Sequence, residues 1–221
     1  MIVPELPLFP LNTVLFPGMP VHLHIFEERY KQMITRCLGE KLPFGVVLIA
    51  HGTEALGPLA QPHPVGCTAH ITQMETLNQG RMNLVAVGET RFRITQLYPQ
   101  KYPYLAGEVD FIPLPEADPR ALRAEAHRLR TWVGRYLEVL GHPERLPFSV
   151  DQLPDDPLTF VYLAATLLQM PAEQKQPLLE APDAVSMVRG LDALYRREIA
   201  LVRNLSQPPH DDPDGSLFTA N

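Results

Sequence analysis

The chain has 221 residues, of which 45% are hydrophobic and 20% are charged. This balance is typical of a globular protein and excludes wholesale disorder. The formal net charge of −6 divides into −1 over residues 1–113, −2 over 114–206 and −3 over 207–221. Because no pervasive basic field exists, we do not expect the body of the chain to bind nucleic acid or an anionic membrane.

The apolar runs indicate whether the chain can span a membrane, and the cysteines indicate its redox compartment. The longest apolar run, residues 160–168, is too short to cross a bilayer, and no positively charged leader precedes an early apolar stretch. Cys37 and Cys67 are the two cysteines, too few for a disulfide framework. We therefore expect reduced thiols in a cytoplasmic protein.

The first part of the chain, residues 1–115, is predicted to be β-rich. In the stretch 21–26, Val21, Leu23 and Ile25 fall on one face and the two histidines on the other, the period of a half-buried strand. The run 44–50 is continuously apolar, as in a strand covered on both faces. A hairpin around residues 78–80 joins strands over 67–77 and 81–94, and a further strand spans 104–112. One helix is expected over 27–38, with Gly39 as its end.

The second part, residues 116–206, has a helical period. Asp118-Pro119 and Asp156-Pro157 each supply an N-cap followed by proline at the first helical position. They predict helices over 119–140 and from 157, the latter apolar nearly all round and hence central. A last helix is expected over 183–205, and residues 207–221 have the composition of a disordered acidic tail. Strands followed by helices predict an α+β protein with a C-terminal helical bundle.

Four segments in this order resemble one known family. They are LPLFPLNTVLFPG with PVHLHIFEERYKQMI (6–34), VGCTAHI (65–71), NQGR with VAVGETRFRI (78–94), and EQKQPLLEAPDA (173–184). Their order and spacing are similar to those of the N-terminal substrate-binding domain of Lon protease, over about residues 1–205. Two positions depart from the family pattern. Cys67 replaces a small or β-branched residue, and Pro177 predicts a helix that is broken or starts late.

The resemblance implies a β-rich, PUA-like pseudo-barrel joined to a helical bundle. In Lon this unit contacts substrate polypeptides and delivers them to an ATPase and a Ser-Lys protease. The chain ends before either module, and it contains neither a G-x-x-x-x-G-K-[ST] phosphate loop nor any Gly-Lys pair. It therefore resembles a standalone Lon substrate-domain protein, and we expect it not to be an enzyme and to need no cofactor.

Several residues are candidates for metal ligands or nucleophiles. His22 and His24 lie on one strand face and could form half of a metal site, but no third ligand is evident, so an exposed strand face is favoured. His63, Cys67 and His70 match no zinc spacing. Because Cys67 and His70 would point to opposite faces of a strand, a buried inert thiol is expected and no metal is assigned.

The arginines carry two further hypotheses. Arg91 and Arg93 flank Phe92 on one strand, so both would share a face that is either structural or able to bind a peptide carboxylate or a phosphate. Five arginines lie opposite the apolar stripe of the first long helix, either as a solvated face or as a site for RNA or an acidic partner. These five are Arg120, Arg123, Arg128, Arg130 and Arg135.

The function predicted from these patterns is a non-catalytic polypeptide-binding module. It would act as an adaptor or holdase for unfolded or exposed hydrophobic segments, in partnership with a Lon-type or other ATP-dependent protease. Some of Phe9, Phe16 and Phe26 are expected to line an exposed apolar groove at a proline-rich edge of the β-rich half, continuous with the neck between the halves, with Arg91 and Arg93 as further contacts. The alternative is a PUA-like RNA- or small-ligand-binding protein. Deleting residues 207–221 is expected to leave the melting temperature unchanged.

Overall fold

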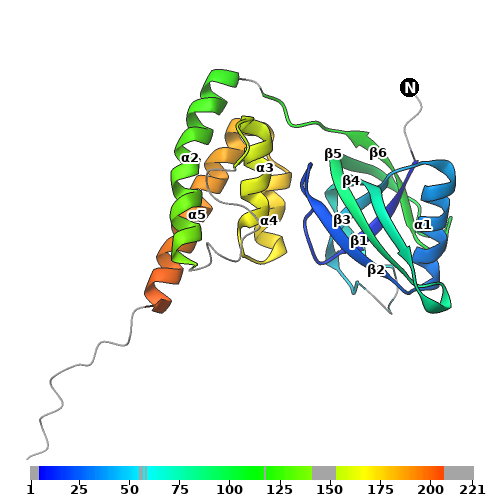
Figure 1. Ribbon diagram of the computed structural model, residues 1–221. Coiled ribbons are helices and arrows are strands. Elements are labelled where there is room, and N and C mark those ends of the chain that lie inside the picture. The colour runs from blue at the N-terminus through cyan, green and yellow to red at the C-terminus, as the bar shows by residue number, and fades with distance from the viewer. Residues whose placement is uncertain (1–4, 55–56, 58, 117, 141–152, 207–221) are drawn as a thin grey trace, which may run out of the picture.

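Strands come first along the chain and most of the helices follow, which confirms the predicted α+β class. A computed structural model describes residues 5–54, 57, 59–116, 118–140 and 153–206. Over these residues the β-rich half contains β1 (Glu5–Leu11), β2 (Pro20–Ile25), α1 (Glu28–Glu40), β3 (Phe44–His51), β4 (Gln61–Thr76), a 3-10 turn (Asn78–Gly80), β5 (Met82–Leu97) and β6 (Leu105–Phe111). The helical half contains α2 (Pro119–Val139), α3 (Pro157–Leu167), α4 (Ala172–Leu179) and α5 (Ala184–Ser206). Figure 1 shows the two halves side by side, connected by the segment between β6 and α2.

The strands form a closed ring with one strand attached outside it. Their order in the sheet is β2-β5-β4-β3-β1-β6, and β5 also pairs with β6. This additional pairing closes the ring, while β2 pairs along residues 82–87 of β5 and with no other described strand. β1 and β3 are parallel, and the other pairs are antiparallel. Every strand of the ring has a neighbour on each side over part of its length, whereas β2 pairs on one side only and so provides the open edge.

β1 is an interior strand, which overturns the expectation that the proline-rich segment forms a sheet edge. Its first residues, Glu5 to Leu8, pair with β6, and residues Leu8 to Leu11 pair with β3. Pro7 therefore lies in a stretch paired only with β6, and Pro10 in a stretch paired only with β3. Each proline has one side without a strand neighbour, where its missing N–H breaks no ladder bond.

Two apolar clusters hold the β-rich half together. One consists of Leu6, Leu8, Val47, Phe92, Leu105 and Val109. The ring of Phe92 needs the glycines beside it, because a Cβ on Gly45 or Gly66 would lie 2.6 or 2.7 Å from its Cζ atom. The second cluster joins the opposite face of β1 and β3 to α1, which contributes Tyr30, Met33, Ile34 and Cys37.

The predicted helix starts of the second half are confirmed. The Asp118 carboxylate accepts hydrogen bonds from the backbone N–H groups of Arg120 and Ala121, at 3.1 and 3.0 Å. The Asp156 carboxylate accepts one from Thr159 N–H at 2.8 Å. Both caps satisfy N–H groups that the first turn of a helix leaves unpaired. The predicted tail, residues 207–221, lies outside the described residues, and the division into units at residue 115 stays a prediction.

Two predicted helix boundaries are wrong. α1 continues through Gly39 to Glu40, and Lys41 ends it in the left-handed conformation with φ of 53°. The helix at Pro177 was expected to be broken or to start late, but α4 begins at Ala172 and continues through Pro177 to Leu179. Proline there removes one hydrogen bond from a helix that is about to stop.

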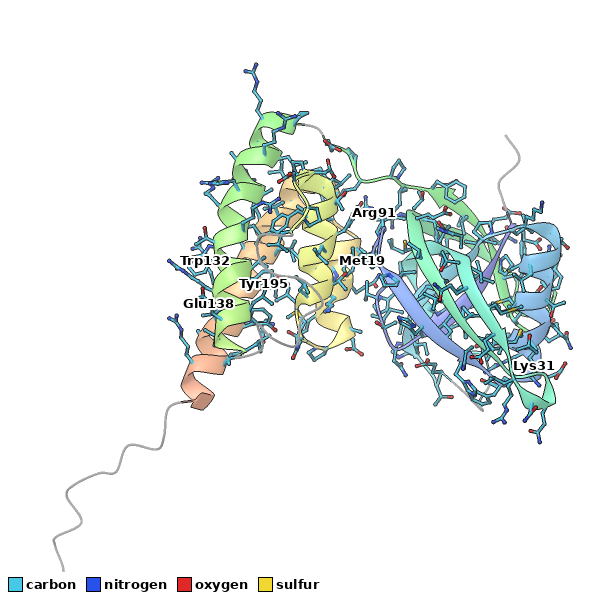
Figure 2. The ribbon with its side chains drawn as sticks, in the orientation of Figure 1. Met19, Lys31, Arg91, Trp132, Glu138 and Tyr195 are labelled. Carbon is cyan, nitrogen blue, oxygen red and sulfur yellow. The ribbon has the colours of Figure 1, made fainter. Side chains whose placement is uncertain are left out.

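The two halves meet around a buried arginine, labelled in Figure 2. Arg91 is 3% exposed, and its Nη1 donates to the carbonyl oxygens of Leu179 and Ala181, at 2.6 and 2.9 Å. These carbonyls lie at the C-terminal end of α4, where helices leave acceptors unpaired. In the reverse direction, Gln176 of α4 donates from Nε2 to the carbonyl of Val65 at 3.0 Å. Side chains from each half thus bind the main chain of the other.

Phe16 closes the same interface with apolar contacts. It is 1% exposed and belongs, with Val65, to the cluster formed by the buried faces of α2, α3, α4 and α5. Its neighbour Leu15 belongs to the cluster of the β-rich half. The turn before β2 therefore contributes to both cores.

Replacing Arg91 tests the polar part of this interface. In Arg91→Ala, the carbonyls of Leu179 and Ala181 stay buried without a donor, so the free energy of unfolding should fall by about 3 kcal/mol. Denaturant titration measures the change. Arg93→Ala, two residues along the same strand but exposed, is the control and should lie within about 0.5 kcal/mol of the parent.

Replacing Phe16 tests the apolar part. Phe16→Ala should lower the free energy of unfolding by about 3–5 kcal/mol, because it removes a fully buried ring. Phe26→Ala, at an exposed ring, should cost less than about 1 kcal/mol. Equal costs for both variants would show that Phe16 does not join the two cores.

Candidate functional site

The structure separates the three phenylalanines that were predicted to line one exposed groove. Phe26 is 42% exposed, but Phe9 and Phe16 are 5% and 1% exposed, so the prediction is wrong for those two. Phe9 is covered because β1 is an interior strand whose opposite faces are both packed. Phe16 is covered because the helical half lies over it. A role in peptide binding stays a prediction for Phe26.

The two arginines predicted to share a binding face are also separated. Arg91 is committed to the interface between the halves, where loss of hydration lowers the pKa of its guanidinium. Arg93 is exposed, and it lines none of the hollows described below. Sequence alternation placed both on one side of β5, but it could not show that the helical half covers the first of them. Contact of Arg93 with a peptide stays a prediction.

Phe26 and Phe9 nevertheless meet at a small hollow at the end of β2. The hollow, of about 50 Å³, is lined by Phe9, His24, Ile25, Phe26, Glu27, Tyr30 and Glu54. At its base the rings of Phe9 and Tyr30 are 4.2 Å apart. At its rim the ring of Phe26 stacks on His24, with centroids 6.0 Å apart. An aromatic surface is therefore available beside the free strand.

A larger hollow of about 460 Å³ lies next to it, across β2, β4 and β5. It is lined by three consecutive residues from each strand: His22, Leu23 and His24, Gln73, Met74 and Glu75, and Asn83, Leu84 and Val85. Nδ1 of His24 and Oδ1 of Asn83 are 2.7 Å apart, which fixes the imidazole across the two strands. His24 lines both hollows. We call the two hollows together with the free edge of β2 the β2 groove.

The β2 groove combines three features that suit an extended chain. β2 offers a six-residue strand edge, the hollow across the sheet offers polar side chains, and Phe26 offers an exposed ring. Met74, also exposed, adds a flexible apolar group to the same wall. Sequence reasoning found Phe26, His22 and His24. It missed Met74, Asn83 and Gln73, because only the pairing of β5 with β2 and of β4 with β5 brings them together.

The residues weighed as metal ligands do not assemble into a site. Among the residues that the structure describes, no three of the His, Cys, Asp and Glu side chains are placed to hold a metal ion. Cys67 is buried, whereas the exposed His70 pairs with Glu89, with 3.1 Å between Nδ1 and Oε1. This confirms that Cys67 and His70 point to different sides of β4.

A second apolar hollow lies at the other end of α1. It has a volume of about 380 Å³ and is bordered by the exposed Leu38 and Leu42, with His70 and Glu89 at its rim. The sequence pattern did not indicate this hollow, because these leucines follow the last buried residue of the helix. The β4 residues at its rim, His70 and Ile71, pair with β5 alone, so the hollow borders a short stretch of β4 that has no strand neighbour on its other side.

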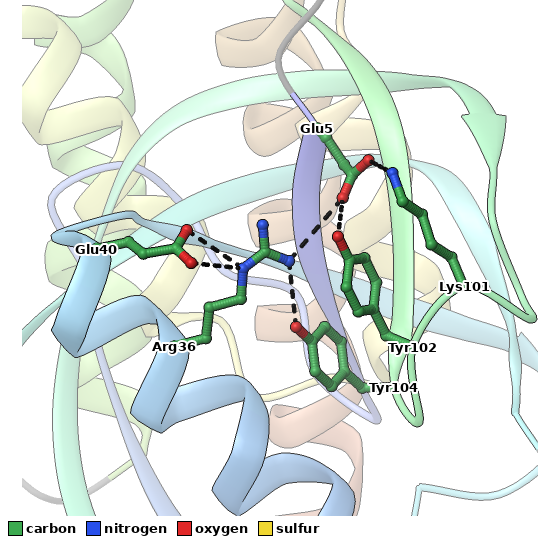
Figure 3. Close-up of polar contacts among 6 residues, drawn as sticks. All are labelled: Glu5, Arg36, Glu40, Lys101, Tyr102 and Tyr104. Atoms are coloured by element: carbon green, nitrogen blue, oxygen red, sulfur yellow. Dashed lines mark hydrogen bonds and ion pairs between the residues drawn. The ribbon is translucent and has the colours of Figure 1, made fainter.

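A polar network fastens α1 to β1 and to the segment before β6 (Figure 3). The Glu5 carboxylate accepts hydrogen bonds from Lys101 and from the Tyr102 hydroxyl, and the Lys101 bond lowers the pKa of Glu5. Arg36 donates to the Tyr104 hydroxyl at 3.3 Å and to Glu40 at 3.3 Å. Because these side chains satisfy one another, the network is structural rather than a vacant binding site.

The arginine face of α2 is confirmed except for one residue. Arg130 is half-buried, its guanidinium lies 4.4 Å from the centroid of the Phe160 ring, and it donates to the Pro154 carbonyl. The other four arginines are exposed. Arg130 therefore attaches α2 to α3, and helical periodicity alone could not distinguish its position from that of an exposed neighbour.

The family is decided by a match along most of the chain. Residues 5–191 match the profile of the ATP-dependent protease La (LON) substrate-binding domain. The chain belongs to the Lon substrate-binding domain family. Lon protease 2 of Myxococcus xanthus is 26% identical over 203 residues, and Lon protease of Phenylobacterium zucineum is 24% identical over 201. Each alignment covers 90% of the chain but 24% and 25% of the relative, so the chain spans about a quarter of their length.

Solved structures agree with the Lon assignment. A Lon N-terminal domain protein from Xanthomonas campestris is 27% identical with a TM-score of 0.63, covering 86% of this chain and 98% of its own. The N-terminal domain of a Mycobacterium avium complex Lon protease has a TM-score of 0.69 at 19% identity, covering 87% and 98%, which shows a shared fold. Within the described residues, no helix is both long enough and apolar enough to span a membrane.

The two thiols provide a test of burial. Burial raises the pKa of Cys37 to about 11 and that of Cys67 to about 12, from an ordinary 9.0. In the folded protein both should resist alkylation by iodoacetamide at about pH 8, whereas both should react in denaturant. Because the unfolded thiols ionise first, stability should also fall as the pH rises above about 9. Rapid alkylation of either thiol in the folded state would contradict the buried positions.

Proposed function

We propose that this protein is a polypeptide-binding module that receives extended, partly apolar chain segments in the β2 groove. The observation that carries the proposal is the free edge of β2 beside the exposed ring of Phe26, in a chain of the Lon substrate-binding domain family. An unpaired strand edge presents backbone donors and acceptors to any extended polypeptide, whatever its sequence. Such binding suits a module that must accept many different segments.

Side chains along β2 would set a modest preference. A segment paired with β2 places alternate residues on the two faces of the sheet. On one face they would meet His22 and His24, and on the other Val21 and Leu23, which are half-buried. A residue beyond Ile25 would reach Phe26, whose exposed ring can bury an aromatic or aliphatic partner. Apolar residues near one end of the bound segment would therefore strengthen binding.

The proposed role is non-catalytic. The sequence has no phosphate loop, and neither thiol is ionised or accessible enough to act as a nucleophile. We propose that the module acts as an adaptor or holdase in the cytoplasm, working with a Lon-type or another ATP-dependent protease. Support for this partner comes from the relatives, which are themselves Lon proteases.

A matched pair of variants tests the site. Phe26→Ser should weaken binding of a fluorescent, carboxymethylated unfolded protein by about tenfold, because the exposed ring is the largest apolar group at the edge of β2. Leu201→Ser on α5 removes a side chain that is 49% exposed, and it should leave affinity within about twofold. Fluorescence anisotropy measures both, and thermal unfolding checks the fold. An equal loss of affinity in the two variants would contradict the proposal.

The binding mode has its own test. A synthetic apolar peptide should lose affinity for the protein by more than about tenfold when alternate backbone nitrogens are methylated, because methylation blocks strand pairing. The unmethylated peptide of the same sequence is the control. Retained affinity after methylation in both possible registers would show that segments bind through side chains alone.

A further inference from the structure

The helices farthest from the β-rich half carry an unusual set of cations. α2 and α5 together hold nine of the chain's 19 basic residues, all of them arginine, against four acidic residues. The chain as a whole has a net charge of −6, so this surface has the opposite sign. In Figure 1, α3 and α4 lie between these two helices and the β-rich half. The excess positive charge is therefore concentrated at one end of the molecule.

A tryptophan lies among these arginines. Trp132 is half-buried, and the guanidinium carbons of Arg135 and Arg196 lie over its ring, at 4.9 and 4.7 Å from the centroid. Residues seven apart share one side of a helix, so the arginines at 128 and 135 of α2 flank Trp132. The same spacing aligns three arginines of α5. We call this set the arginine–tryptophan face: Arg128, Trp132, Arg135, Arg189, Arg196 and Arg203.

Three of the five positive charges on this face are not neutralised by an ion pair among the described residues. Arg128 pairs with Glu125 at 2.6 Å, and Arg196 pairs with Asp192 at 2.9 Å. Arg135, Arg189 and Arg203 are exposed, and none forms an ion pair with another described residue. By contrast, Arg91 connects the two halves through hydrogen bonds, and Arg130 attaches α2 to α3. Of these three, Arg135 lies over the Trp132 ring, while Arg189 and Arg203 lie seven residues to either side of Arg196 on α5.

We infer that the arginine–tryptophan face docks an acidic segment of a partner protein. Its sign requires an anionic partner, and arginine presents a planar fork that binds a carboxylate through two hydrogen bonds. Tryptophan and arginine are the residue types enriched at the centres of protein interfaces, where lysine is depleted. The absence of lysine from both helices therefore favours a protein over a nucleic acid, whose phosphates are bound by either cation.

The position of the face gives the inference a functional meaning. The β2 groove lies in the other half of the molecule, beyond α3 and α4. A segment bound there and a partner docked on α2 and α5 would not compete for the same surface. The protein could hold both at once. The inference about the arginine–tryptophan face rests on the charges and contacts of α2 and α5 alone. Its test therefore does not depend on peptide binding in the β2 groove.

Trp132 supplies the measurement, because it is the only tryptophan in the chain. Its fluorescence would be followed while poly-L-glutamate, or oligouridylate of equal charge, is added to the whole protein. We expect polyglutamate to change the emission at low salt and binding to weaken as salt is added. Oligouridylate should bind more weakly.

Two triple variants of equal charge locate the site. Arg135→Gln, Arg189→Gln and Arg203→Gln together should weaken polyglutamate binding by at least about tenfold. Lys41→Gln, Arg81→Gln and Arg93→Gln remove three exposed cations of the β-rich half and should leave it within about twofold. Unchanged thermal unfolding would show that both variants are folded.

Three results would overturn the inference. No change in emission with either polymer would mean that the arginines form only a solvated surface. An equal loss of affinity in the two variants would mean diffuse attraction rather than a docking face. Tighter binding of oligouridylate, lost in the first variant alone, would make the face a nucleic-acid site instead.

Discussion

The relation between the two halves depends on one buried cation. Arg91 is buried, and no carboxylate among the described residues forms an ion pair with it. Its hydrogen-bond partners are the main-chain carbonyls of Leu179 and Ala181. The end of a helix is a favourable place for such a charge, because the last carbonyls are unpaired and the helix dipole is negative there. This requires α4 to stop at Leu179, and the short helix containing Pro177 meets that requirement. Gln176, one turn earlier, adds the reciprocal bond to β4.

This interface determines which surfaces remain for binding. Phe16, Val65 and Arg91 are buried between the halves and are therefore not accessible to a ligand. The accessible features lie elsewhere, at the β2 groove in one half and at the outer helices in the other. One half therefore presents a strand edge and an aromatic ring, while the other presents guanidinium groups. The two surfaces differ in chemistry as well as in place.

Local patterns predicted the elements of this fold well. The alternation over Val21–Ile25, the caps at Asp118 and Asp156 and the turn at Asn78–Gly80 depend on neighbours in sequence, and each is confirmed. The predictions that were wrong concern features that depend on pairing between segments distant in sequence. The prolines of β1 indicated an edge because the stagger between its two neighbours cannot be read from one strand. Phe9, Phe16 and Arg91 were expected to be accessible because periodicity assigns a face to a residue but not the layer that covers it.

The pairing of β1 has a consequence for the order in which the chain acquires its structure during synthesis. Leu8 of β1 pairs with Gly45 of β3 on one side and with Leu105 of β6 on the other, nearly a hundred residues later. Until β6 has left the ribosome, β1 has one unpaired edge and the apolar row of Leu6 and Leu8 is incompletely covered. The helices that cover Phe16 and Arg91 are synthesised after β6. The chain therefore passes, while it is being made, through a stage in which its own first strand is an exposed apolar segment.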